Sequence, residues 1–404
     1  MMKIPLSSPD IGEREVEYVS AVLRSQQLSL GPWVSRFEER FAEYVGARFA
    51  VAASSGTSAL HMCIRAMGIG PGDEVITTPY SFVASANCIL YEGATPVLLD
   101  IDRATYNLNH ETLRDFLAQN CERKRDGGAV NRKTGRTIKA ILPVHVFGLP
   151  CEMDAIVELA REYGLMILED ACEAIGAKYR GRTIGTFGDA AVFAFYPNKQ
   201  MTSGEGGMIV TDNADLAEQC RSLRNQGRDE NGRWLAHVRL GFNYRLSDIH
   251  CALGVAQLER IQELLTARES VAAEYARELA GCKLLRLPPS MDGCERSWFV
   301  YVIELSGAPG NGLRDRVRDR LHQAGIATQV YFPAIHRQPY FMQYQPEIPM
   351  PLRNAESAAE SCLAIPFSGR MTKQEIGIVC KELKNAVAAE LQSLHDDAPA
   401  TVPA

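Results

Sequence analysis

Residues 139–171, KAILPVHVFGLPCEMDAIVELAREYGLMILEDA, contain two apolar runs of strand length and a helical segment between them. The runs are KAILPVHVFG (139–148) and GLMILEDA (164–171), and the intervening CEMDAIVELAREYG has the spacing of a helix. Parallel neighbouring strands require a crossover connection, which is usually a helix. The stretch therefore predicts a β-α-β unit of a parallel sheet.

The same alternation of apolar runs and helical segments continues on both sides of this unit. Other strand-length runs are FAVAASS (49–55), EVITTPY (74–80), ATPVLLDID (94–102), DAAVFAFYP (189–197) and GGMIVTD (206–212). Two amphipathic helices are expected before them, over 10–27 and 33–45. We predict an α/β fold whose large domain has a mainly parallel central sheet.

The C-terminal part of the chain has a different pattern. It is helical over about 245–281, and FVYVIEL (299–305) is a clear strand. RDRVRDRLHQAG (314–325) has helical spacing and ends on a glycine. This pattern predicts a smaller C-terminal α+β domain, which a long helix near 250–275 joins to the large domain.

We place the large domain at residues 1–260 and the small domain at 261–395, with the N-terminal segment packed on the small domain. Residues 396–404, DDAPATVPA, are expected to be a disordered tail. The polar stretch 120–137, NCERKRDGGAVNRKTGRT, is expected to be a loop insertion.

Composition excludes several classes of protein. The 404 residues are 46% hydrophobic and 23% charged, an ordinary globular balance, and the net charge of −6 with no basic stripe argues against a nucleic-acid partner. The 11 cysteines form no CxxC pair and predict reduced thiols in a cytoplasmic protein. We expect no metal site, no signal peptide and no membrane span, because their motifs and apolar runs are missing.

Two segments predict places for charged groups of a ligand. Ser54-Ser55-Gly56-Thr57-Ser58 lies between a strand and a helix, where hydroxyls and backbone N–H groups suit a phosphate. Glu169-Asp170 ends a strand, and a carboxylate there could hold a protonated ring nitrogen. The alternatives are a helix cap without a ligand at 54–58 and a helix cap at 169–170.

Two further segments contain candidate reactive and binding residues. Lys199 lies in FAFYPNKQMTSGEGG, after an apolar run and before a glycine-rich turn, where a lysine can act as a nucleophile or Schiff-base former. Asn243 and Arg245 precede a long helix that starts near Ser247-Asp248. The alternatives are an ordinary surface lysine, and capping chemistry with a surface arginine.

The order and spacing of these segments resemble those of the sugar-nucleotide aminotransferases of the DegT family. The likeness runs from IPLSSPDIG (4–12) to CLAIPFSGRMTKQEI (362–376) and includes SSGTSAL, TTPYSFVASANCIL, ILEDACEAIG, FAFYPNK, NYRLSDIHCALG and FPAIHRQPY. This resemblance implies fold type I, the cofactor pyridoxal 5'-phosphate (PLP) and transamination.

The resemblance also implies roles for individual residues. Lys199 would hold PLP covalently and move a proton between the substrate carbon and the cofactor. Asp170 would keep the pyridine nitrogen protonated, so that the ring withdraws electrons. Gly56 and Thr57 would bind the phosphate, and Phe82 would stack on the ring.

Asn243 would reach the phosphate of the neighbouring subunit, which implies a homodimer with shared active sites. Arg245 and His336 would lie on the substrate side.

Two positions depart from the usual pattern of relatives. Ala194 stands where many have a serine, so that backbone N–H groups, Thr57 or another hydroxyl must compensate. Glu173 stands where a glutamine contacts the phenolic oxygen, so that it should be protonated, turned away or sharing a proton.

The implied reaction is a transfer of an amino group from L-glutamate to a nucleotide-linked ketosugar. Some relatives with a histidine in place of Lys199 catalyse dehydration, so the lysine favours aminotransfer. TSGEGGM (202–208) resembles relatives that aminate carbon 4 of a 4-keto-6-deoxy sugar. The alternatives are a carbon-3 ketosugar or cyclitol aminotransferase, a dehydratase, a PLP-binding regulatory protein and a structural module without cofactor.

Overall fold

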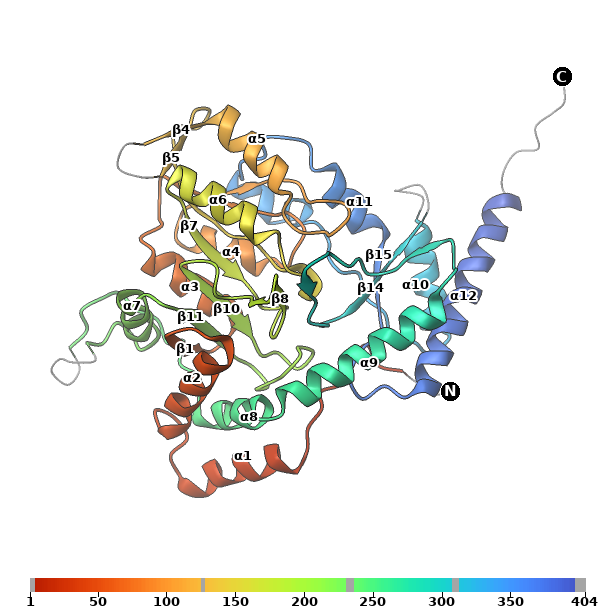
Figure 1. Ribbon diagram of the computed structural model, residues 1–404, viewed down its shortest axis with the longest axis horizontal. Helices are drawn as coiled ribbons and strands as arrows, with labels where there is room; N and C mark the ends of the chain where they lie inside the picture. Colours follow the sequence, from red (N-terminus) through yellow and green to blue (C-terminus); the bar gives the residue numbers. More distant parts are fainter. Residues whose placement is uncertain (1–3, 125–127, 230–235, 307–311, 397–404) are drawn as a thin grey trace.

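A sheet of nine strands, counted over the described residues, forms the centre of the fold (Figure 1). The structure is a computed structural model that describes residues 4–124, 128–229, 236–306 and 312–396. Along the main path the strands have the order β1-β11-β10-β7-β6-β2-β3. The nine strands are β1 (Phe49–Ala53), β2 (Asp73–Thr77), β3 (Thr95–Leu98), β4 (Cys121–Arg123), β5 (Ala129–Asn131), β6 (Thr137–Ile141), β7 (Met166–Asp170), β10 (Ala190–Ala194) and β11 (Gly207–Thr211).

The predicted β-α-β unit is present as β6, α6 (Met153–Tyr163) and β7, and β6 and β7 pair in parallel. β7 is also parallel to β10, β6 to β2, and β2 to β3. Only β11 on the main path runs against its neighbours, β1 and β10. The prediction of an α/β fold with a mainly parallel central sheet is therefore confirmed.

Helices cover both faces of this sheet because side chains alternate across each strand. In β10, Val192 enters one core, whereas Ala191 and Phe193 enter the other. Helices α3, α4 and α7 pack into the first core, and α2, α5, α6 and α8 into the second. The helices of this region are α1 (Glu13–Ser25), α2 (Pro32–Val45), α3 (Gly56–Ala66), α4 (Ala84–Tyr91), α5 (His110–Asn120), α6, α7 (Ala214–Arg224) and α8 (Asp248–Leu258).

The polar stretch 120–137 is not a loop insertion, and that prediction was wrong. Its described residues include β4 and β5, which pair with each other, and β5 also pairs with β6. Asn131 is buried and donates through Nδ2 to the Glu74 carboxylate at 2.9 Å. Strands of three residues are too short to produce a readable alternation of apolar residues, and backbone pairing with β6 stabilises them.

A second, antiparallel sheet and three long helices form a separate core. The sheet is β12 (Leu285–Arg286), β14 (Tyr301–Leu305) and β15 (Cys362–Ile365), and the helices are α9 (Ile261–Leu279), α10 (Leu313–Gln323) and α12 (Lys373–Asp396). Ile4 belongs to this core and pairs with Ile326. The domain boundary at residue 260 stays a prediction. Asp396 ends α12, and the rest of the expected tail, 397–404, lies outside the described residues.

The helical stretch over 245–281 consists of two helices, not one. α8 ends at Leu258, and Arg260 leaves the helical conformation with φ −119° and ψ 20° before α9 begins. Leu264 of α9 packs in a core of the large sheet, whereas Val271 and Tyr275 pack in the core of the small sheet. Figure 1 shows α9 running from one sheet toward the other.

Short elements complete the described chain. They are the third sheet of β8 (Lys178–Tyr179), β9 (Arg182–Thr183) and β13 (Cys294–Glu295), the 3-10 helices η1 (Val146–Gly148), η2 (Ile335–Arg337) and η3 (Phe341–Tyr344), and α11 (Arg353–Ser361). Over the residues that the structure describes, every helix is too short or too polar to cross a lipid bilayer.

The contact between α2 and α8 generates a prediction about two glycines within helices. A Cβ on the buried Gly254 of α8 would lie 2.6 Å from the ring of Phe37, whereas a Cβ on Gly377 of α12 would meet nothing within 4 Å. Gly254→Ala should lower the free energy of unfolding by about 1–3 kcal/mol through overpacking. Gly377→Ala should raise it by about 1 kcal/mol, because alanine is the better helix former. Chemical denaturation of both variants measures the difference, and equal signs would contradict the packing argument.

Candidate active site

A cavity of about 690 Å³ lies where strands of the large sheet end. Asp170 ends β7 and Ala194 ends β10, and both line it together with residues of the first turn of α3. In parallel sheets this edge is the usual place for a ligand. The cavity brings together six of the residues singled out in the sequence: Gly56, Thr57, Phe82, Asp170, Glu173 and Lys199.

Lys199 projects into the cavity from the turn that follows β10. Its amide donates to the carbonyl of Tyr196 at 2.9 Å, which closes the turn. Its side chain is 12% exposed, and Nζ lies 3.6 Å from Oε1 of Glu173 and 3.8 Å from the centre of the Phe299 ring. The amine is therefore held among an acid, an aromatic face and the cavity, and it is no ordinary surface lysine.

Asp170 is the member of the Glu169-Asp170 pair that faces the cavity. One carboxylate oxygen accepts from the Ser85 hydroxyl at 2.7 Å and the other from the Cys172 amide at 3.2 Å. Within the described residues no side-chain nitrogen of a lysine, arginine or histidine comes within 4.0 Å of this carboxylate, so its charge is available to a cationic group of a ligand. Glu169 instead accepts from the backbone amides of the 185–188 turn at 2.7–2.9 Å.

The alternative of a helix cap at Glu169-Asp170 is wrong. Residues 171–177 form turns, and no helix begins there. The strand alternation places the two neighbouring carboxylates on opposite sides of β7, where one has a structural role and the other faces the cavity.

The first turn of α3 presents an anion-binding surface to the cavity. Ser55 caps the helix by accepting from the Ser58 amide at 3.1 Å. A Cβ on Gly56 would lie 2.9 Å from the Ala194 Cβ, and a Cβ on Gly207 would lie 2.4 Å from the Ser55 carbonyl oxygen. The glycines thus let the helix start approach β10 and β11, where its free N–H groups favour a negative charge.

Because Ala194 has no hydroxyl, Thr57 is the neighbouring residue whose hydroxyl could bind a phosphate. Ala194 lines the cavity beside Gly56. The Thr57 hydroxyl has no hydrogen-bond partner in the part of the chain that the structure describes, and it also lines the cavity. A phosphate placed at the start of α3 could accept from it.

Glu173 is buried, and its surroundings act on its charge in opposite directions. Burial raises the pKa of the carboxyl, while the nearby Lys199 ammonium and the amide of Phe147, which donates to Oε2 at 2.9 Å, lower it. The net effect is a raised pKa. The side chain is turned into the cavity and not away from it, so the acid is placed to share a proton with a ligand oxygen.

Three predicted site residues are not brought into this cavity by the chain itself. Asn243 is exposed and pairs through its backbone with Asn225, and Arg245 donates to the Asn225 side chain at 3.0 Å. His336 lies on η2, with Nε2 at 3.0 Å from the Glu356 carboxylate. Their roles stay proposals.

The structure adds lining residues that the sequence did not reveal. Ser85 orients Asp170, and Phe299 and Tyr331 close the cavity from segments more than 100 residues after Asp170 in the sequence. Burial raises the pKa of Tyr331 to about 12, and its hydroxyl accepts from Asn198 at 3.2 Å. A serine within the apolar helix 84–91 was a signal for Ser85, whereas nothing near Phe299 or Tyr331 in the sequence indicates a site.

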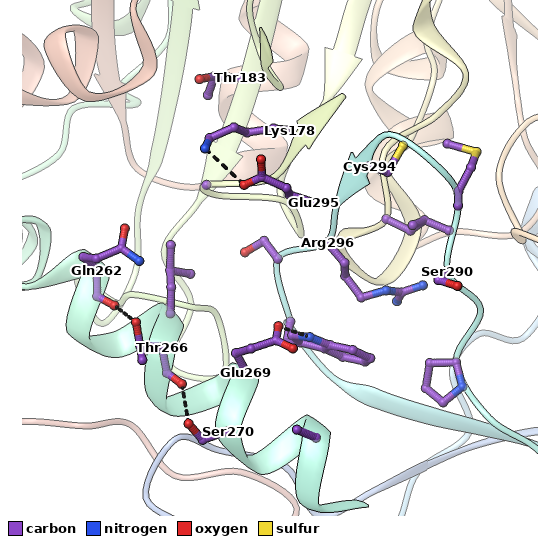
Figure 2. Close-up of a pocket in the computed structure, with 18 of the residues that line it drawn as sticks. Lys178, Thr183, Gln262, Thr266, Glu269, Ser270, Ser290, Cys294, Glu295 and Arg296 are labelled. Atoms are coloured by element: carbon purple, nitrogen blue, oxygen red, sulfur yellow. Dashed lines mark hydrogen bonds and ion pairs between the residues drawn. The ribbon is translucent and has the colours of Figure 1, made fainter. Parts of the chain in front are cut away.

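A second cavity, of about 810 Å³, lies between α9 and the 288–298 segment (Figure 2). Several of its polar groups bind one another: Lys178 pairs with Glu295 at 3.0 Å, and the Trp298 indole N–H donates to Glu269 at 2.6 Å. It contains no residue singled out in the sequence. No group of three or more metal-ligating side chains occurs among the described residues.

The smaller cavity has the groups that PLP requires. The start of α3 suits its phosphate, the Asp170 carboxylate suits a protonated pyridine nitrogen, and Lys199 suits its aldehyde. Phe82 is 60% exposed, so a face of its ring is free to stack. The volume is within the usual range of cofactor pockets.

Comparisons with known proteins agree with this chemistry. The chain matches the model of the DegT/DnrJ/EryC1/StrS aminotransferase family over residues 9–384. A Caulobacter vibrioides protein named GDP-perosamine synthase is 39% identical over 387 residues, which cover 94% of this chain and 97% of that protein. An Escherichia coli O157:H7 protein of the same name is 32% identical over 384 residues, 95% of this chain and 98% of that protein.

A solved structure extends the likeness to the whole fold. DesV from S. venezuelae has a TM-score of 0.84 at 30% identity, and the match covers 96% of this chain and 99% of that one. The resemblance seen in the sequence is thus confirmed, together with fold type I and the PLP cofactor. The chain belongs to the DegT/DnrJ/EryC1/StrS aminotransferase family and is a PLP-dependent aminotransferase.

Proposed function

We propose that this aminotransferase moves an amino group from L-glutamate to a nucleotide-linked ketosugar, at carbon 4 of a 4-keto-6-deoxy sugar. The observation that carries the aminotransfer chemistry is the meeting of Lys199 and Asp170 in one cavity, next to the anion-binding start of α3. The relatives named GDP-perosamine synthase support a nucleotide-linked sugar as the acceptor.

The preference for carbon 4 rests on the segment TSGEGGM (202–208). It resembles relatives that aminate carbon 4, whereas those that act at carbon 3 more often have GDGGA. Glu205 of this segment is exposed and lines the cavity beside Tyr196 and Asn198. An acceptor sugar that reaches Lys199 from this side would pass these polar groups, which suit its hydroxyls.

The proposed mechanism assigns the proton transfers to two residues. PLP, when bound, would supply an aldehyde group that takes up the amino group from the donor and a ring that withdraws electrons. Nζ of Lys199 would take the proton from the donor carbon in the first half of the reaction and would deliver a proton to the acceptor carbon in the second half. The Asp170 carboxylate keeps a proton on the ring nitrogen, and Ser85 and the Cys172 amide hold that carboxylate in place.

Other residues of the cavity bind and orient. Gly56 and Thr57 hold the phosphate through backbone N–H groups and the free hydroxyl, and this contact replaces the hydroxyl that Ala194 lacks. Phe82 stacks on the ring. Glu173, with its raised pKa, can donate a proton to the phenolic oxygen of the ring and need not oppose it as a second anion.

We propose a homodimer with shared active sites. Asn243 is exposed and does not line the cavity of its own chain. Two strongly exposed apolar side chains, Val238 at 56% and Leu240 at 80%, lie on the same segment and suit a protein interface. Asn243 of a second copy would complete the phosphate site, and Arg245 and His336 are proposed substrate-side residues.

We also propose a cytoplasmic location. All eleven cysteines lie within the described residues, and none forms a disulfide. Most are buried, and a reducing compartment is where such thiols persist.

A panel of nucleotide ketosugars tests the proposed reaction. With glutamate, the purified enzyme should convert a 4-keto-6-deoxy sugar linked to a nucleoside diphosphate into a product whose mass differs by the exchange of C=O for CH–NH₂. Carbon-3 ketosugars and cyclitol ketones should react much more slowly. Mass spectrometry measures the products, with Lys199→Ala as the inactive control. Amination of a cyclitol alone would overturn the choice of substrate.

Mixed subunits test both Lys199 and Asn243. Lys199→Ala should remove transamination, because no other amine takes the proton, and Asn243→Ala should weaken PLP binding. If a site combines Lys199 of one copy with Asn243 of the other, equal mixing with subunit exchange should restore about a quarter of the sites. The activity of the mixture is compared with that of each variant alone at the same total protein concentration. Independent sites would give no gain on mixing.

The raised pKa of Glu173 predicts a pH-dependent stability of the cofactor-free protein. A carboxyl whose pKa is higher in the folded than in the unfolded protein stabilises the fold while it is protonated. This stabilisation is fully present below the unfolded-state pKa of about 4 and is lost as the pH rises through the folded-state pKa. Gln cannot ionise, so the melting temperature of Glu173→Gln minus that of the wild type should become more positive as the pH rises, then level off.

Thermal melts at a series of pH values measure this difference. Glu295→Gln, at an exposed carboxyl paired with Lys178, is the matched control and should change the melting temperature little at any pH. In the enzyme with PLP, the pH at which the absorbance of the PLP bound to Lys199 changes should be lower in Glu173→Gln than in the wild type. A difference in melting temperature that is constant over the pH range would contradict the account of Glu173.

A further inference from the structure

Arg268 is a buried cation in the middle of α9 and has only main-chain carbonyls as hydrogen-bond partners among the described residues. The residue is 4% exposed. Nη2 donates to the carbonyls of Lys199 at 2.6 Å and Asn198 at 3.3 Å. Nη1 donates to the carbonyls of Phe299 at 3.1 Å and Trp298 at 3.5 Å.

These carbonyls belong to two segments that meet at the cavity. The first segment carries the Lys199 side chain, and the second carries the Phe299 ring, which lies 3.8 Å from the Lys199 Nζ. One guanidinium therefore holds the backbone on both sides of this contact between the amine and the ring. The planar fork of an arginine suits such a double attachment, because its donors point in fixed directions.

We propose that Arg268 is a positioning residue for Lys199, which sets the place of the amine relative to Phe299, Glu173 and the bound cofactor. The inference rests on the proposed role of Lys199. Arg268 does not line the cavity of about 690 Å³ and touches no reacting group. It acts through the backbone of Lys199.

Burial of a cation without a directly bound carboxylate is costly, and the charge of Asp10 offsets this cost only from beyond ion-pair distance. Burial lowers the pKa of Arg268 to about 10, which still leaves it charged at neutral pH. Charge-assisted hydrogen bonds to carbonyls are stronger than neutral ones. They anchor the Lys199 turn to α9, whose ends pack in the cores of the large and the small sheet.

Arg268 therefore gives the Lys199 backbone a support that the hydrogen bonds within the turn before Lys199 do not give. The hydrogen bond from its amide to Tyr196 closes the turn before it, and the wider segment is closed by the Ser203 amide and the Thr202 hydroxyl, which both donate to the Phe195 carbonyl. Without Arg268 the backbone of Lys199 would be less well fixed, and so would the position of its Nζ. Reaction rates are sensitive to shifts of about 1 Å in such groups.

Two variants separate positioning from stability. Arg268→Met keeps the length of the side chain and removes every donor. Arg268→Lys keeps the charge and can bind a carbonyl, but it cannot hold both segments with a fork. Arg314→Met is the control, because Arg314 also donates to two main-chain carbonyls, of Ala359 at 2.8 Å and Cys362 at 3.3 Å. It lies on α10 away from the cavity and differs from Arg268 in its ion pair with Asp315 at 2.9 Å.

Three measurements are made on each protein. Borohydride reduction at timed intervals after PLP is added, followed by peptide mass spectrometry, gives the rate at which PLP becomes attached to Lys199. Absorbance in a single turnover with glutamate gives the rate at saturation and the half-saturating concentration. Thermal melting of the cofactor-free protein gives the stability.

In Arg268→Met, both rates should fall by about 10- to 100-fold, while the half-saturating glutamate concentration changes by less than about threefold. Arg268→Lys should recover part of each rate. Arg314→Met should melt at a lower temperature with both rates within about twofold of the wild type.

Rates in Arg268→Met that match those of Arg314→Met at a similar loss of stability would overturn the inference and leave a structural arginine. If Arg268→Met does not fold, wild-type rates in Arg268→Lys would overturn it as well. Attachment of PLP to a lysine other than Lys199 in the wild type would refute the proposed role of Lys199, which is a separate failure.

Discussion

The site depends on an uncompensated carboxylate at the end of a buried strand. Asp170 ends β7 at the centre of the sheet, and the chain supplies it with a hydroxyl and an amide but with no cationic partner within reach among the described residues. A buried anion without a counter-charge is costly, and a protonated ring nitrogen removes that cost. The fold thus contains one half of an ion pair and leaves the other half to the cofactor.

The site also depends on the close approach of the start of α3 to β10 and β11, which forms its anion-binding surface. The start of α3 can lie against β10 and β11 only because Gly56 and Gly207 have no side chains at the contact. That approach places free N–H groups beside the Lys199 turn and the Asp170 carboxylate. It also explains how the cavity accommodates an alanine at 194, since helix N–H groups and the Thr57 hydroxyl remain for an anion.

The amine itself depends on parts of the chain that are remote in sequence. Phe299 faces Lys199 from the segment before β14, and Arg268 ties both to α9. Since α9 packs in two cores, a shift between the large and the small sheet would reach the Lys199 turn directly. Glu173 lies 3.6 Å from the same amine, so the protonation of its carboxyl depends on where that amine is held.

The sequence by itself determined the β-α-β alternation, the parallel sheet and the order of the motifs, because apolar periodicity and strand ends are local properties. It also predicted Gly56, Thr57, Phe82, Asp170, Glu173 and Lys199, which the structure brings into one cavity. It missed the hairpin of β4 and β5, whose strands are too short to carry a periodic signal. Only the tertiary structure decided which of two adjacent carboxylates faces the cavity, that Ser85, Phe299 and Tyr331 line it, and that Arg268 holds the backbone of Lys199 from outside it. These contacts join segments that have no common pattern along the chain.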